Sequence, residues 1–246
     1  MAKKIKYLLD LIYSYMLGRV VETTHSEINS CLEVTYMNGK YMLNSLQANY
    51  SYGMLQKVFD SVFKKIKIQK YPVKDVLILG FGVGSVASLL QEKYKINCNI
   101  TGVEKDDQVI SLGHKYFNLQ RFINTEIICA DAYDFVMGNK KNFDLIIVDV
   151  YIDNLVPENI ENEKFLTQLK SSLNDKGMII FNKMIFDKET ERSSKKLYET
   201  FGKVMCKFKY HKIHKHHTNL MLVYEHGALI DNPKLPIHFH SLHKMF

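Results

Sequence analysis

The chain has 246 residues, of which 46% are hydrophobic and 24% charged, and its formal net charge is +7. These values are typical of a soluble globular protein with a sizeable core, and they exclude a disordered or fibrous chain. The lysines are spread along the sequence without a basic arm, which favours a generally basic surface over a nucleic-acid groove.

The beginning of the chain and the cysteines indicate in which cellular compartment the protein is expected. The first 20 residues combine a basic head with an apolar stretch, but Asp10 interrupts that stretch and no small-residue cleavage site follows. An amphipathic helix is therefore expected rather than a signal peptide. No apolar run reaches the ~18 residues that a membrane span needs. Four scattered cysteines without metal-ligand or redox spacing indicate free thiols. We therefore expect a cytoplasmic protein without a membrane partner.

Residues 1–70 are expected to form a small N-terminal unit made of a helix, a β-hairpin and a connecting helix. The hairpin is indicated over 27–50 by two β-like runs that Asn38 and Gly39 join, because Asn-Gly is a strong signal for a type I′ turn. Apolar residues at helical spacing follow over 52–66.

Residues 71–246 alternate short apolar strands with amphipathic helices, which predicts a mostly parallel sheet covered on both faces. A helix over 188–201 is followed by two apolar runs, 204–210 and 219–227, with no helix between them. These runs are expected to form an antiparallel pair at the sheet edge. The predicted fold class is therefore α/β, a Rossmann-like fold with a seven-stranded sheet. Its other strands are expected at 76–80, 99–104, 125–130, 143–150 and 177–182.

The stretch "VLILGFGVGS" carries an apolar strand directly into a turn with glycines at alternate positions. Gly80, Gly82 and Gly84 would let the backbone turn tightly and approach a ligand without a Cβ in the way. In a doubly wound sheet such a turn lies where the ligand binds. The pattern alone fits a dehydrogenase, an enzyme that uses S-adenosylmethionine (SAM), or a tight turn without a ligand.

Acidic residues end the next three strands. Glu104 lies 20 residues after Gly84, where a carboxylate can accept both hydroxyls of a ribose. Asp131 can accept from the exocyclic amine of an adenine, and the backbone at Ala132 can meet a ring nitrogen. Asp149 ends the fourth strand and would point into the reaction zone. Three successive strands that end in acids, together with the antiparallel C-terminal pair, favour SAM over a nicotinamide cofactor.

These blocks resemble the SAM-methyltransferase fold, specifically its spermidine synthase-like branch. The resemblance runs in order through "VLILGFGVGS", "GVEKDDQVISLGHKYF", "CADAYDFV" and "FDLIIVDVY", and the hairpin unit ending in "LQANYSYG" also fits. It implies SAM or its decarboxylated analogue as the cofactor. Relatives of this branch commonly dimerise, and the exposed sheet edges would allow a homodimer. The residues expected at the cofactor are Gly80, Phe81, Gly82, Gly84, Glu104, Lys105, Asp131 and Ala132.

The chain departs from spermidine synthases at three positions that bind the polyamine or the donor. The Asp that these enzymes typically carry in the glycine turn is Val83 here, and their Tyr-His-Glu run reads Tyr-Gly-Met at 52–54. Their Asp-Ser-Ser-Asp-Pro loop is replaced by "DVYIDNLVP", in which Asp149 and Asp153 are four positions apart rather than three. A cationic polyamine needs carboxylates spaced to hold its amines. The departures therefore disfavour aminopropyl transfer.

The sequence favours a SAM-dependent transferase, and methyl transfer to a small-molecule acceptor is the predicted reaction. Asp149 is the first catalytic candidate, as general base or as an orienting group, and Tyr151 and Asp153 follow it. An equally weighted alternative is that Asp149 only caps the loop or bonds backbone amides. Two rival functions stay open: an aminopropyltransferase with altered anchors, and a nucleoside-binding protein without turnover. A dehydrogenase is the third.

A histidine-rich run lies on the predicted connection between the last two strands and is interleaved with lysines. Because neighbouring ammonium groups disfavour a bound cation, these side chains are expected to be solvated, and no metal site is predicted. The histidines in this run are His211, His214, His216 and His217.

Overall fold

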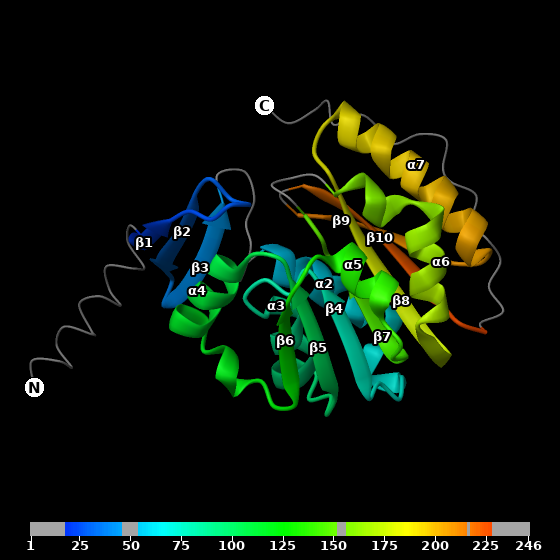
Figure 1. Cartoon of the computed structure of the whole chain (residues 1–246), viewed down its shortest axis with the longest axis horizontal. Coiled ribbons are helices and arrows are strands. Elements are labelled where there is room, and N and C mark those ends of the chain that lie inside the picture. Colours follow the sequence, from blue (N-terminus) through cyan, green and yellow to red (C-terminus); the bar gives the residue numbers. More distant parts are fainter. Residues whose placement is uncertain (1–17, 46–53, 152–155, 216, 228–246) are drawn as a thin grey trace, which may run out of the picture.

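The computed structural model describes residues 18–45, 54–151, 156–215 and 217–227, which form two sheets and the helices around them (Figure 1). The smaller sheet is antiparallel, in the order β1-β2-β3. Its strands are β1 (Arg19–Thr24), β2 (Leu32–Met37) and β3 (Lys40–Ser45).

The larger sheet has seven strands in the order β6-β5-β4-β7-β8-β10-β9. The strands from β4 to β8 pair in parallel, and β10 is antiparallel to both of its neighbours. This arrangement confirms the predicted α/β class with a mostly parallel sheet and an antiparallel C-terminal pair. The strands are β4 (Asp75–Leu79), β5 (Asn99–Glu104), β6 (Thr125–Cys129), β7 (Phe143–Val148), β8 (Leu173–Ile185), β9 (Lys209–His214) and β10 (Thr218–Glu225).

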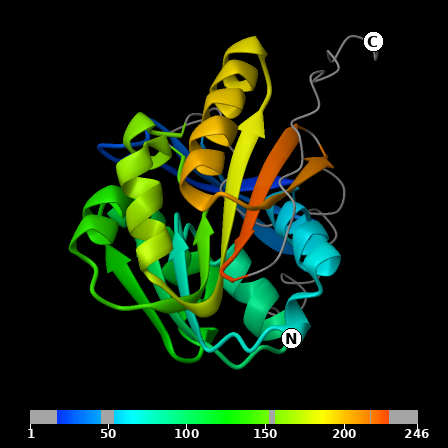
Figure 2. The same ribbon diagram turned by 90° about the vertical axis from the view of Figure 1, so that its right-hand side faces the viewer.

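Helices cover both faces of this sheet (Figure 2). Side chains alternate along β4, so Val76 and Ile78 join one buried cluster and Leu77 and Leu79 the other. The first cluster includes α2, α4 and the π-helix Ser88–Lys93, and the second includes α5, α6 and α7. The α-helices are α2 (Met54–Ile66), α3 (Ser85–Ala87), α4 (Asp107–Phe117), α5 (Ala132–Gly138), α6 (Glu163–Ser171) and α7 (Lys188–Met205). None of the described helices is long and apolar enough to cross a membrane.

Two elements differ from the expectation. β1 begins at Arg19, inside the stretch expected to be an N-terminal helix, because its β-branched residues pair with β2. The run 204–210 was expected to be a strand, but α7 continues to Met205 and β9 begins at Lys209. The helix is longer because Met205 is buried on the same face as Phe201, at helical spacing. The rest of the expected N-terminal helix, residues 1–17, lies outside the described residues.

The small sheet is fixed to the large one beside the carboxyl end of β5. Asp106 caps α4 by accepting from the backbone of Gln108 and Val109. Its other oxygen, Oδ2, accepts from the Ser26 hydroxyl at 2.5 Å and from Asn29 Nδ2 at 2.6 Å. One buried carboxylate therefore joins the loop before β2 to the helix that follows β5.

Replacing Asn29 by Ala is expected to lower the free energy of unfolding by about 1–3 kcal/mol, because a buried charged acceptor loses a donor. Urea denaturation would measure this loss. Ser30→Ala, at the exposed neighbouring position, is the matched control. Equal stabilities of the two variants would show that the contact with Asp106 contributes nothing.

Candidate active site

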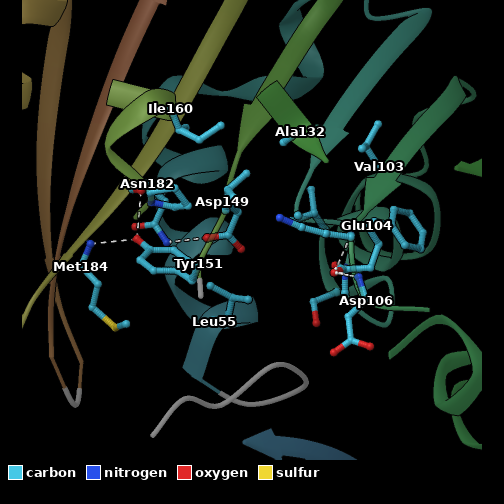
Figure 3. Close-up of a pocket in the computed structure, with 18 of the residues that line it drawn as sticks. Leu55, Val103, Glu104, Asp106, Ala132, Asp149, Tyr151, Ile160, Asn182 and Met184 are labelled. Carbon is cyan, nitrogen blue, oxygen red and sulfur yellow. Dashed lines mark hydrogen bonds between the residues drawn. The ribbon is translucent and has the colours of Figure 1, made fainter. Parts of the chain in front are cut away.

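A cavity of about 600 Å³ lies at the carboxyl ends of the parallel strands (Figure 3). The turn after β4 and the segments that follow β5, β6 and β7 line one side of it. Asn44 and Ser45 of β3 and Leu55 of α2 also contribute, so the N-terminal sheet forms part of its wall. The cavity thus occupies the place where a doubly wound sheet binds its ligand.

The glycines of the turn after β4 differ in role: some line the cavity, and some are required by close packing. Gly80 has a φ of +80°, and a Cβ there would lie 2.1 Å from the backbone oxygen of Asp149. Gly80, Phe81 and Gly82 line the cavity. Gly84, also expected at the cofactor, does not line it, because its backbone faces the Phe122 ring, which a Cβ would approach to 2.4 Å. A side chain at position 84 would therefore collide with the Phe122 ring.

Glu104 is held rigidly with its carboxylate in the cavity wall. Oε2 accepts from Gly82 N at 2.8 Å, and Oε1 accepts from the backbone N–H groups of Lys105 at 2.9 Å and Asp106 at 3.1 Å. The side chain is 8% exposed, and burial raises its pKa although the three amides oppose that shift. Oε1 already accepts two of these bonds and Oε2 only one, so Oε2 is the oxygen that is open to a hydroxyl donor.

Asp131 follows β6 and lines the same cavity together with Lys105 and Ala132. Its Oδ1 caps α5 by accepting from the backbone N–H groups of Tyr133 and Asp134, and its Oδ2 pairs with Lys105 Nζ at 3.0 Å. Burial would raise the pKa of Asp131, but the Lys105 ammonium and the two amides outweigh it, so the pKa lies below its usual value. Asp131 therefore stays an anion at neutral pH.

Asp149 lies between these groups and the β8 side of the cavity (Figure 3). Its Oδ1 accepts from Asn182 Nδ2 at 2.8 Å, and the residue as a whole is 8% exposed. Burial raises its pKa to about 7, and the negative charge of Glu104 adds to the shift, while the bond from Asn182 opposes it. A carboxyl group with this pKa is suited to accept a proton near neutral pH.

Tyr151 and two asparagines fix the position of Asp149. The Tyr151 hydroxyl donates to Asn182 O and accepts from Met184 N, both at 2.9 Å. Asn219 Nδ2 donates to Asn182 Oδ1 at 2.9 Å. Because both bonds of the Tyr151 hydroxyl go to the β8 backbone, and burial raises its pKa well above the usual value, Tyr151 is better suited to positioning than to proton transfer.

Sequence reasoning did not select Asn182 or Asn219. Asn182 follows an apolar run near the carboxyl end of β8, the same signal that identified the acids on the other strands, but only acids were considered. Asn219 meets it through the pairing of β10 with β8, for which the sequence carries no local signal. Asp153 and His216 lie outside the described residues. Among the residues that the structure does describe, no group of three potential ligands is arranged to hold a metal ion.

Comparisons with known proteins agree with the resemblance found in the sequence. The chain is 30% identical over 130 residues to the polyamine aminopropyltransferase of Vibrio vulnificus, covering 52% of this chain and 43% of the relative. It is 32% identical over 106 residues to a probable polyamine aminopropyl transferase of Bifidobacterium longum, covering 43% of this chain and 23% of the relative. The chain thus spans less than half the length of these curated relatives.

Solved structures show the same fold. A probable spermidine synthase from Corynebacterium glutamicum superposes with a TM-score of 0.65 at 18% identity, covering 84% of this chain and 80% of that one. The sequence model of the spermine/spermidine synthase domain matches residues 58–226, which is more than half of the chain. The resemblance to the spermidine synthase-like branch is therefore confirmed, and the chain belongs to the spermine/spermidine synthase domain family.

Proposed function

We propose that the protein transfers an aminopropyl group from decarboxylated SAM to a primary amine, with Asp149 as the general base. The family and the names of the relatives support this alternative better than methyl transfer, the reaction first expected from the sequence. The observation that carries the proposal is a buried carboxyl group with a pKa of about 7, which lines one cavity together with Glu104 and Asp131.

The donor is assigned to the β4–β6 side of the cavity. Glu104 would accept the ribose hydroxyls, because its backbone bonds hold the carboxylate in place before the ligand arrives. Asp131 would accept from the adenine amine, and the backbone of the Gly80–Gly82 turn, which lines the cavity, would pass beside the nucleoside. The sulfonium would then lie near Asp149, which follows the neighbouring strand β7.

The reaction needs an amine that has lost its proton. The lone pair of the acceptor nitrogen attacks the aminopropyl carbon that is bound to the sulfonium, forming a C–N bond as the bond from that carbon to sulfur breaks. The bonding pair goes to sulfur, so neutral 5′-methylthioadenosine leaves. Asn182 occupies Oδ1 of Asp149, and we assign the proton from the acceptor nitrogen to Oδ2.

Methyl transfer from SAM is the second candidate, and Val83 favours it. Val83 stands where spermidine synthases typically carry an Asp that helps bind the amino end of the donor. The Val83 side chain is fully buried and does not line the cavity. The turn therefore offers the aminopropyl ammonium no carboxylate.

The two candidates give different products. With decarboxylated SAM and a primary amine, we expect the protein to release 5′-methylthioadenosine. Formation of S-adenosylhomocysteine from SAM, with no reaction of the decarboxylated donor, would replace the proposal by methyl transfer. Binding of either donor without any product would indicate a nucleoside-binding protein.

The pH dependence of turnover is expected to follow Asp149. Because a base must be ionised to accept a proton, kcat at saturating donor and acceptor should rise with pH through a midpoint near the pKa of about 7. Initial rates from pH 5 to pH 9 would measure this. A rise that tracks only the amine, shifting when acceptors of different basicity are exchanged, would argue against Asp149.

A further inference from the structure

The cavity continues beyond Asp149 across the next strands of the sheet. Asp149 follows β7, Asn182 is on β8 and Asn219 is on β10, which are successive neighbours in the sheet. Hydrogen bonds of 2.8 and 2.9 Å link the three side chains in that order. Since neighbouring strands are about 4.8 Å apart, β10 lies roughly 10 Å from β7.

Among the described residues, the two halves of the cavity differ in charge. The described carboxylates that line it all lie at or just after the carboxyl ends of β5, β6 or β7, and they are Glu104, Asp106, Asp131 and Asp149. The half beyond Asp149 is lined instead by Asn182, Met184, Asn219, Lys215 and His217. Lys215 and His217 are on the turn between β9 and β10, which Lys215 N closes by donating to His217 O at 3.1 Å. Within the described residues, Lys215 forms no ion pair.

This second half is poorly suited to the second ammonium of a diamine. An acceptor whose nitrogen lies at Asp149 and whose chain runs along Asn182 and Asn219 would end near Lys215, where like charges repel. A carboxylate tail would instead meet that ammonium. The side-chain nitrogens of Asn182 and Asn219 each carry a second N–H group that is not used in the chain of hydrogen bonds. These two N–H groups can donate to an anion.

The distances fit a short acceptor. An amine and a carboxylate joined by three methylenes are about 5 Å apart when extended. The distance between β7 and β10 is roughly 10 Å, and the side chain of Lys215 is long enough to span the part that the acceptor leaves.

Resting on the proposed function, we infer that the acceptor is a primary amine with an anionic tail, and that Lys215 selects it. Lys215 is a specificity-determining residue in this assignment, because it would contact the tail of the acceptor and not the reacting atoms. The inference would separate this chain from enzymes that extend polyamines, although its donor and its base are those of the proposed reaction.

Three acceptors with the same four-carbon chain test the assignment: 4-aminobutanoate, butylamine and 1,4-diaminobutane. With decarboxylated SAM as donor, kcat/KM from 5′-methylthioadenosine release is expected to fall in that order, with about tenfold or more between the first and the last. Lys215→Glu should reverse the order. Lys207→Glu makes the same change of charge at an exposed position that does not line the cavity, and it should leave the order unchanged.

Calorimetric titration of the same amines into protein saturated with 5′-methylthioadenosine measures the preference without turnover. If 4-aminobutanoate binds more tightly than the other two amines, and Lys215→Glu abolishes this preference, the assignment is supported even if no amine reacts. The lack of reaction would then overturn only the proposed function. A preference of the unmodified protein for 1,4-diaminobutane, or an order that Lys215→Glu does not move, would overturn the assignment.

Discussion

Replacing Asp149 by Asn is expected to lower kcat by about 10²–10⁴-fold, which is the usual contribution of a positioned general base. Asn is almost the same size, and its carbonyl oxygen can accept from Asn182 as Oδ1 of Asp149 does. The NH₂ group of the new amide would take the position that Oδ2 now occupies, and an amide NH₂ group cannot accept a proton. The loss should therefore appear in kcat more than in the affinity for the donor.

The same variant is expected to be more stable than the unmodified protein at about pH 8. The pKa of Asp149 is raised from 3.8 to about 7 on folding, so the folded protein binds a proton there more tightly than the unfolded chain. The stability that this group contributes is complete below pH 3.8 and is lost as the pH rises to about 7. Above that pH the ionised side chain costs a few kcal/mol, and Asn removes the cost. The melting temperature should rise by several degrees at about pH 8 and by less at about pH 5.

Asp144 is the matched control because it is on the same strand, at the end away from the cavity. It accepts from Lys74 N, Asp75 N and Asn174 Nδ2, and although burial opposes them, these bonds hold its pKa below the usual value. Asp144→Asn should therefore lower the melting temperature at neutral pH and leave kcat unchanged. If both variants shift stability in the same direction, the account of Asp149 is wrong.

Replacing Glu104 by Gln is expected to weaken the binding of 5′-methylthioadenosine by about 100-fold or more, because charge-assisted bonds to the ribose hydroxyls are lost. Gln is a severe change here, since both carboxylate oxygens accept backbone N–H groups. In either orientation the new NH₂ group meets an N–H donor. The melting temperature should therefore fall, in contrast to the rise expected for Asp149→Asn.

Titration calorimetry on folded protein would measure this affinity. Glu126→Gln, at an exposed position on the neighbouring strand β6, makes the same chemical change outside the cavity and should bind like the unmodified protein. Equal affinities of the two variants would show that Glu104 does not hold the ribose.

The features of the site that could be predicted from the sequence are those that depend on local pattern. Glu104, Asp131 and Asp149 each follow a short apolar run, and the carboxyl ends of parallel strands meet at one edge of the sheet. The strand order then brings all three to one cavity. The glycine turn was also recognisable, although only the structure shows that Gly84 packs on Phe122 instead of lining the cavity.

The remaining features depend on contacts between distant segments. The bond from Asn219 to Asn182 requires β10 to insert beside β8, and the bond from Asn29 to Asp106 joins residues 77 positions apart. No local pattern carries such pairings. The raised pKa of Asp149 likewise results from burial by several elements at once, so the acid could be named from the sequence but its protonation could not.

A crystal structure of the protein with 5′-methylthioadenosine tests the central assignment most directly. We expect both ribose hydroxyls within about 2.5–3.2 Å of the Glu104 carboxylate, with the sulfur directed toward Asp149. A nucleoside bound outside this cavity, or bound in it with the ribose turned away from Glu104, would contradict the account.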